Sequence, residues 1–199
     1  MLDEPFRQWM SRTAASPARA MRRRGITPNQ VTIVALVMGL AAAGVIALGS
    51  LRTGIAIWLA SRILDGYDGM LARLSGQGSL FGGFLDITAD MLAYSAMAIG
   101  FAVAMPDDRV LWLVVLAGYV MAITTTLALS SLLERADRQL GGNRSLQFTP
   151  ALAEGGETSI VYSVIALWPM WSRAVLVAWI ALLAATMVQR TRLAYRLLR

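Results

Sequence analysis

Four aspartates lie in one mainly apolar segment, DGYDGMLARLSGQGSLFGGFLDITAD, which spans residues 65–90. Asp65 and Asp68 are three residues apart, and Asp86 and Asp90 are four residues apart. Residues at these spacings share one face of a helix. Several glycines separate the two pairs, which favours a tight connection and a close approach of two helices. A helical hairpin would therefore bring all four carboxylates together.

Carboxylates that face one another cannot all stay ionised without cations. The chain has no cysteine and no histidine, so imidazole-based zinc sites and Ser-His-Asp triads are excluded. An all-oxygen donor set favours Mg²⁺, Mn²⁺ or Ca²⁺. Two divalent ions held between carboxylates would suit a polyanion, in particular a pyrophosphate. The alternative is that these aspartates are solvated residues near a helix end.

The composition indicates that these aspartates belong to a membrane protein. The 199 residues are 57% hydrophobic and only 15% charged, whereas soluble domains carry about 25% charged residues. Residues 31–51 and 110–133 are uncharged, and each run is long enough to cross a bilayer, which takes roughly 20 residues. A charge near the centre of such a helix costs about 2.5–3.5 kcal/mol, so four acids are not expected there for packing alone.

We predict an all-α integral membrane protein with six transmembrane helices and an N-terminal cytoplasmic interfacial arm. The arm comprises residues 1–29, in which arginines alternate with aromatic residues and methionines. Residues 30–199 form the six-helix transmembrane catalytic domain. The expected helices span residues 30–50, 53–74, 81–105, 109–136, 157–169 and 171–195.

The distribution of arginine predicts the orientation in the membrane. All 18 basic residues are arginines, and the net charge is +6. Most lie in the first 30 residues, after the fourth expected helix and at the C-terminal end, whereas the opposite loops hold only Arg52, Arg109 and Arg173. By the positive-inside rule both termini are cytoplasmic, and the aspartates face the cytoplasm. We therefore expect a multi-pass protein of the cell (cytoplasmic) membrane, with membrane lipids rather than nucleic acid as partners.

Eight positions of the same segment form a longer pattern. The residues fit D-x-x-D-G-x-x-A-R-x₈-G-x-x-x-D-x-x-x-D, and the pattern resembles the signature of the CDP-alcohol phosphatidyltransferase family. The six-helix arrangement and the TPNQVT entry to the first helix resemble that family too. The eight matching residues are Asp65, Asp68, Gly69, Ala72, Arg73, Gly82, Asp86 and Asp90.

The resemblance implies a reaction and a role for each motif residue. Such an enzyme transfers the phosphatidyl group of CDP-diacylglycerol to the hydroxyl of a small alcohol acceptor, releases CMP and forms a homodimer. The metal ligands, for two Mg²⁺ or Mn²⁺ ions, would be Asp65, Asp68, Asp86 and Asp90, with Asp90 also acting as the catalytic base. The residues at the CDP donor would be Asp65, Gly69, Ala72, Arg73 and Gly82.

Two arginines of the second expected helix have alternative interpretations. Arg73 would pair with a donor phosphate, or it would be a positively charged anchor at the helix end. Arg62 lies three residues before Asp65 on the same face of an apolar helix. It would contact the acceptor, or it would form a structural ion pair with one of the aspartates.

Further candidate residues for the acceptor lie beyond the motif. Glu154 and Glu157 flank two glycines and would bind hydroxyl or amine groups of the acceptor, or would simply cap a helix. Arg135, Arg138 and Arg144 would hold an acceptor phosphate, or would only set the topology. The residues do not choose among serine, glycerol 3-phosphate, inositol phosphate and glycerol as the acceptor.

Two other classes of function compete with the enzyme. In a cation transporter or channel, the intramembrane aspartates would form an ion path, but acids would then be spread through the depth of the membrane on several helices. The third interpretation is a catalytically silent scaffold, which the intact motif disfavours.

Overall fold

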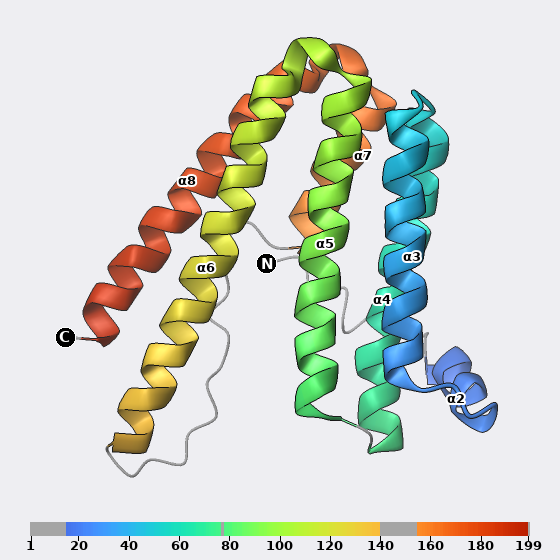
Figure 1. Ribbon diagram of the computed structural model, residues 1–199, viewed down its shortest axis with the longest axis vertical. Helices are drawn as coiled ribbons and strands as arrows, with labels where there is room; N and C mark the ends of the chain where they lie inside the picture. Colours follow the sequence, from blue (N-terminus) through green and yellow to red (C-terminus); the bar gives the residue numbers. More distant parts are fainter. Residues whose placement is uncertain (1–14, 77, 140–154, 199) are drawn as a thin grey trace.

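The computed structural model describes residues 15–76, 78–139 and 155–198, and within these ranges the chain is all-helical (Figure 1). The α-helical fold is therefore confirmed, and the helix boundaries agree with the expected ones to within a few residues. The helices are α2 (Ala15–Arg23), α3 (Pro28–Ala47), α4 (Leu51–Ser75), α5 (Leu80–Ala104), α6 (Arg109–Gln139), α7 (Gly155–Leu167) and α8 (Ser172–Leu197). Two short 3₁₀ turns, η1 (Pro106–Asp108) and η2 (Pro169–Trp171), precede α6 and α8.

Local signals fix the ends of the helices that carry the aspartates. Ser79 caps α5, because its side chain accepts a hydrogen bond of 2.9 Å from the backbone nitrogen of Gly82. Gly76 ends α4 in the left-handed conformation, with φ of 66°, which glycine adopts without steric cost. The connection between α4 and α5 is therefore short, as the glycines predicted.

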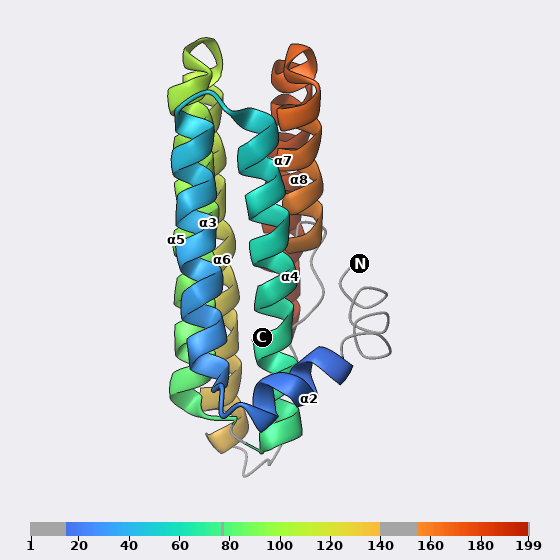
Figure 2. The same ribbon diagram turned by 90° about the vertical axis from the view of Figure 1, so that its right-hand side faces the viewer.

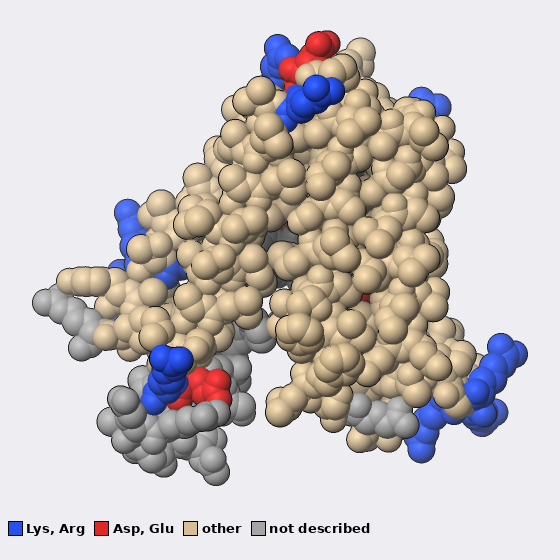
Figure 3. Space-filling view, viewed as in Figure 1, with Lys and Arg blue, Asp and Glu red and all other residues tan. Residues whose placement is uncertain are grey.

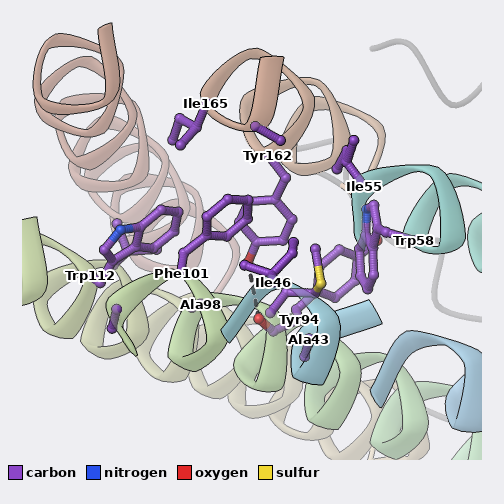
Figure 4. Packing of buried hydrophobic residues seen from close by; sticks show 14 of the residues in the cluster. Ala43, Ile46, Ile55, Trp58, Tyr94, Ala98, Phe101, Trp112, Tyr162 and Ile165 are labelled. Carbon is purple, nitrogen blue, oxygen red and sulfur yellow. Dashed lines mark hydrogen bonds between the residues drawn. The ribbon is translucent and has the colours of Figure 1, made fainter. Parts of the chain in front are cut away.

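The helices form two groups that meet around an aromatic core. α3 packs against both α4 and α5, α6 packs against α8, and α7 contacts α4 and α8 (Figures 1 and 2). Rings from several helices fill the centre (Figure 4). Phe101 stacks on Trp112 with ring centroids 4.9 Å apart, and Trp58 meets Tyr94 and Tyr162 edge to face at 5.1 and 5.6 Å. Such pairs contribute about 0.5–1.5 kcal/mol beyond their buried area.

Four stretches within the described residues are long and apolar enough to cross a membrane: Pro28–Ala47, Leu80–Ala104, Pro106–Arg135 and Pro169–Leu197. α4 falls short because several charged residues interrupt it, and α7 because it has only 13 residues. The structure thus gives an all-helical protein with four candidate spans, and the number six stays a prediction. On the face shown in Figure 3, the charged side chains lie mainly near the ends of the molecule.

Polar contacts join the helices at one end of the molecule. Asp108 is buried, with 7% of its surface exposed, and its carboxylate accepts hydrogen bonds from Ser172 Oγ and, at 3.0 Å, from Arg173 Nε. These contacts tie η1 to the start of α8. From this tied end, α6 diverges from α5 toward the opposite end of the molecule (Figure 1).

α2 lies at the other end, against the last turns of α4 (Figure 2). Arg22 Nη1 donates a hydrogen bond of 2.8 Å to the carbonyl of Leu74, and Ala18 is buried beside Met70. Residues 1–14 lie outside the described ranges, so the interfacial arm over residues 1–29, and its boundary with the domain of residues 30–199, stay predictions.

Candidate active site

A cavity of about 690 Å³ lies between α4, α5 and the first turns of α7. Side chains of α4 and α5 supply most of its polar lining, and Gly155, Gly156 and Ser159 line it from α7. All four aspartates of the motif reach this cavity, so the hairpin brings the two pairs together as their spacing predicted. The charged residues that line it are Arg62, Asp65, Asp68, Arg73, Asp86 and Asp90.

Three of the carboxylates form a compact group of oxygen donors. One oxygen from each of Asp65, Asp68 and Asp86 lies within 4.8 Å of the others. Asp68 is 9% exposed, and its Oδ2 accepts a hydrogen bond of 2.6 Å from Thr32 Oγ1 on α3. An all-carboxylate set at this separation fits a hard divalent cation such as Mg²⁺ or Mn²⁺.

Asp90 lies beside this group but has a different partner. Its Oδ1 forms an ion pair with Arg62 Nη1, and the same nitrogen lies 3.6 Å from Asp65 Oδ2. The guanidinium carbon of Arg62 lies 4.6 Å from the centre of the Trp58 ring and 5.5 Å from that of Tyr94. The ion pair that the sequence offered as one alternative for Arg62 is therefore present.

The other motif residues differ in their distance from the cavity. Gly69 and Arg73 line it, and a Cβ added to Gly69 would lie 3.5 Å from Arg73 Nη1. Ala72 and Gly82 do not line it. A Cβ at Gly82 would lie 3.2 Å from Ser79 Oγ and 3.3 Å from the Asn29 side-chain oxygen, so this glycine permits a close approach at the start of α5.

Of the candidate acceptor residues, Arg62 alone is described in the cavity lining. Arg135 is exposed near the end of α6, and Glu157 is partly buried in the first turn of α7; neither lines the cavity. Glu154 and the side chain of Arg138 lie outside what the structure describes. Of the described candidates, Arg135 and Glu157 therefore do not reach the cavity that holds the aspartates.

Two polar side chains that the sequence analysis did not name, Tyr94 and Ser159, also line the cavity. Tyr94 follows Asp90 by four residues on α5, and this helical spacing could have revealed it. Ser159 belongs to α7, and its Oγ accepts a hydrogen bond of 3.3 Å from Trp58 Nε1. No spacing within the sequence predicts that contact, because it depends on how α7 packs against α4.

Comparisons with known proteins agree with the resemblance. The family model of the CDP-alcohol phosphatidyltransferases matches residues 25–190. The chain is 33% identical to the inner membrane protein YnjF of Escherichia coli K12, over 77% of this chain and 75% of that protein. It is 31% identical to the archaetidylinositol phosphate synthase of Pyrococcus horikoshii, over 72% of this chain and 71% of that protein.

Solved structures share the fold. Phosphatidylinositol phosphate synthase of Mycobacterium tuberculosis with CDP-DAG bound superposes with a TM-score of 0.71, at 24% identity, over 92% of this chain and 94% of that one. The same enzyme in complex with manganese and citrate gives a TM-score of 0.70, at 24% identity, over 90% and 88% of the two chains. These similarities are to the fold alone.

The family match covers most of the chain, including the whole aspartate motif. The two similar sequences each extend over more than two thirds of both chains. These findings give no support to a cation transporter or channel. The chain belongs to the CDP-alcohol phosphatidyltransferase family, and it is an enzyme of that class.

Proposed function

We propose that this enzyme of phospholipid synthesis transfers the phosphatidyl group of CDP-diacylglycerol to the hydroxyl of an alcohol acceptor and releases CMP. The observation that carries the proposal is the convergence of Asp65, Asp68 and Asp86 beside Asp90 in one cavity. The related M. tuberculosis synthase has been solved with CDP-DAG bound, which supports this donor.

We assign the metal ligands to Asp65, Asp68 and Asp86, with Asp90 completing a site for two Mg²⁺ or Mn²⁺ ions. The manganese complex of the M. tuberculosis enzyme supports a divalent metal. When bound, the ions supply positive charge that stabilises the pyrophosphate and the leaving CMP. Thr32 orients Asp68 through its hydrogen bond of 2.6 Å, and such outer contacts tune the affinity of a metal site.

The remaining motif residues position the substrates. Asp90 takes the proton of the acceptor hydroxyl as that oxygen attacks the phosphorus, which is the role of a general base. Gly69 lets the nucleotide approach the backbone of α4, and Arg73, at the exposed end of this helix, donates hydrogen bonds to a donor phosphate. In-line transfer then depends on positioning and charge stabilisation.

For the acceptor we propose a phosphorylated polyol, because several relatives are archaetidylinositol phosphate or phosphatidylinositol phosphate synthases. Arg138 and Glu154 are the candidate phosphate and hydroxyl contacts, whereas Arg135 and Glu157, which do not line the cavity, would contact the acceptor only outside it. We further propose that the enzyme is a homodimer with both termini and the active site on the cytoplasmic side.

The test uses purified protein in liposomes with CDP-diacylglycerol, Mn²⁺ and a panel of alcohols, including inositol phosphate. We expect metal-dependent CMP release with at least one acceptor, and Asp90→Asn should reduce kcat by about 10²–10⁴-fold. Asp107→Asn makes the same change at an exposed aspartate of η1 and should retain the wild-type rate. If no acceptor supports CMP release, or if Asp90→Asn keeps full activity, the proposal is wrong.

A further inference from the structure

We propose that Arg62 is a positioning residue, which holds the Asp90 carboxylate apart from the three-carboxylate group and oriented toward the acceptor. The inference rests on the proposed function, because it takes Asp90 as the base. The ion pair between Arg62 Nη1 and Asp90 Oδ1 joins α4 to α5 across the cavity. Arg62 lies outside the family motif, which begins at Asp65.

The guanidinium of Arg62 is fixed from several sides. Its Nε and Nη2 donate hydrogen bonds of 3.3 and 3.2 Å to Ser61 Oγ. Its guanidinium carbon lies 4.6 Å from the centre of the Trp58 ring and 5.5 Å from that of Tyr94, an arrangement that stabilises a cation. The side chain is only 11% exposed. An arginine held in this way presents Nη1 to Asp90 at a defined place.

The charges at the site explain why Asp90 needs such a partner. Asp65, Asp68 and Asp86 already bring three carboxylates within 4.8 Å of one another, and a fourth anion beside them is repelled. Arg62 supplies a positive charge between Asp90 and Asp65, lying 3.6 Å from Asp65 Oδ2. The pair therefore fixes the Asp90 carboxylate at the side of the three-carboxylate group.

The same contacts argue against Arg62 as a primary contact of the acceptor. Arginine often recognises a phosphate through two parallel N–H donors. Here Nη1 is engaged by Asp90, while Nε and Nη2 are directed to Ser61. All three guanidinium nitrogens of Arg62 therefore already have partners within the protein.

The experiment compares Arg62→Gln and Arg62→Lys with Arg52→Gln, which removes the same charge from an exposed position at the start of α4. For Arg62→Gln we expect kcat to fall by about tenfold or more, because a misplaced catalytic group loses up to about 10²-fold. Binding of Mn²⁺ alone, titrated directly, should become tighter, since a positive charge next to the carboxylates is gone. Arg62→Lys should retain more activity than Arg62→Gln, and Arg52→Gln should match wild type in both measurements.

The two measurements separate positioning from a general defect. A misfolded variant would lose kcat and Mn²⁺ affinity together, whereas the proposal requires them to change in opposite directions. In an Asp90→Asn background, Arg62→Gln should lower the residual rate by less than about twofold, because residues that act through one another are not additive. An undiminished loss in that background, or a raised acceptor KM with unchanged kcat, would overturn the inference. If wild-type enzyme itself releases no CMP, the proposed function fails instead.

Discussion

Thr32 shows how one hydroxyl on a neighbouring helix contributes to the acidic site. It belongs to α3, which carries none of the motif aspartates, and it is 3% exposed. Its Oγ1 lies 2.6 Å from Asp68 Oδ2 and 3.2 Å from the carbonyl of Pro28. The hydroxyl donates to the carboxylate and thereby selects one orientation of Asp68.

Thr32→Val removes this donor at nearly constant volume. We expect the Mn²⁺ concentration for half-maximal activity to rise by about tenfold or more, because loss of an outer contact typically weakens metal binding by 10–100-fold. Thr32→Ser keeps the hydroxyl and should stay close to wild type. A titration of CMP release against Mn²⁺ checks both variants, and an unchanged midpoint in Thr32→Val would show that Asp68 needs no such support.

For individual residues, the sequence predicted that the four aspartates would meet, but it did not predict the contacts of each one. The spacing of Asp65, Asp68, Asp86 and Asp90 was enough to place all four in one cavity. The sequence offered an ion pair of Arg62 with one of the aspartates, but it did not predict that the partner would be Asp90 while the other three converge. That division depends on the relative rotation of α4 and α5, which arises from packing and not from the spacing within either helix.

Among the elements, α7 depends on a glycine at its first position. A Cβ added to Gly155 would lie 2.6 Å from the hydroxyl oxygen of Tyr94 on α5, closer than real Cβ contacts allow. The hydroxyl of Tyr162 on α7 in turn donates a hydrogen bond of 3.0 Å to the carbonyl of Tyr94 (Figure 4). These contacts fix the distance of α7 from α5, and with it one wall of the cavity.

Gly155→Ala should therefore destabilise the protein, by about 1–3 kcal/mol as for other overpacked positions. Tyr94→Phe removes the clashing oxygen, so we expect the double variant to recover most of the lost thermal stability in detergent. Gly44→Ala, on α3 with no atom within 4 Å of the added Cβ, is the matched control. If Tyr94→Phe gives no recovery, the close contact is not what limits this position.

The apolar pattern of the sequence predicts some helices better than others. The helices expected over residues 81–105 and 109–136 agree closely with α5 (Leu80–Ala104) and α6 (Arg109–Gln139). α4 was expected as a span, but its charged residues keep it from being long and apolar enough by composition alone. Arg62, Asp65 and Asp68 line the cavity instead of the outer surface. This shielding is a property of the bundle rather than of the helix itself.

For the whole molecule, the orientation in the membrane is open to a direct test. The chain has no cysteine, so single cysteines report position without a background. Asp107→Cys and Arg196→Cys place exposed thiols near the two ends of the molecule, in η1 and late in α8. We expect a membrane-impermeant maleimide to label position 107 in intact cells and position 196 only after permeabilisation. The opposite pattern would reverse the proposed topology.

The tie at Asp108 gives the molecule the geometry of a long lever. α6 has 31 residues, so at 1.5 Å per residue it is about 46 Å long. It is anchored where η1 meets α8 and separates from α5 toward the end that holds the aspartates (Figure 1). For such a lever, a pivot of about 5° at the anchor corresponds to about 4 Å at the far tip. Contacts at the tied end therefore influence how far the distant tip of α6 lies from α5.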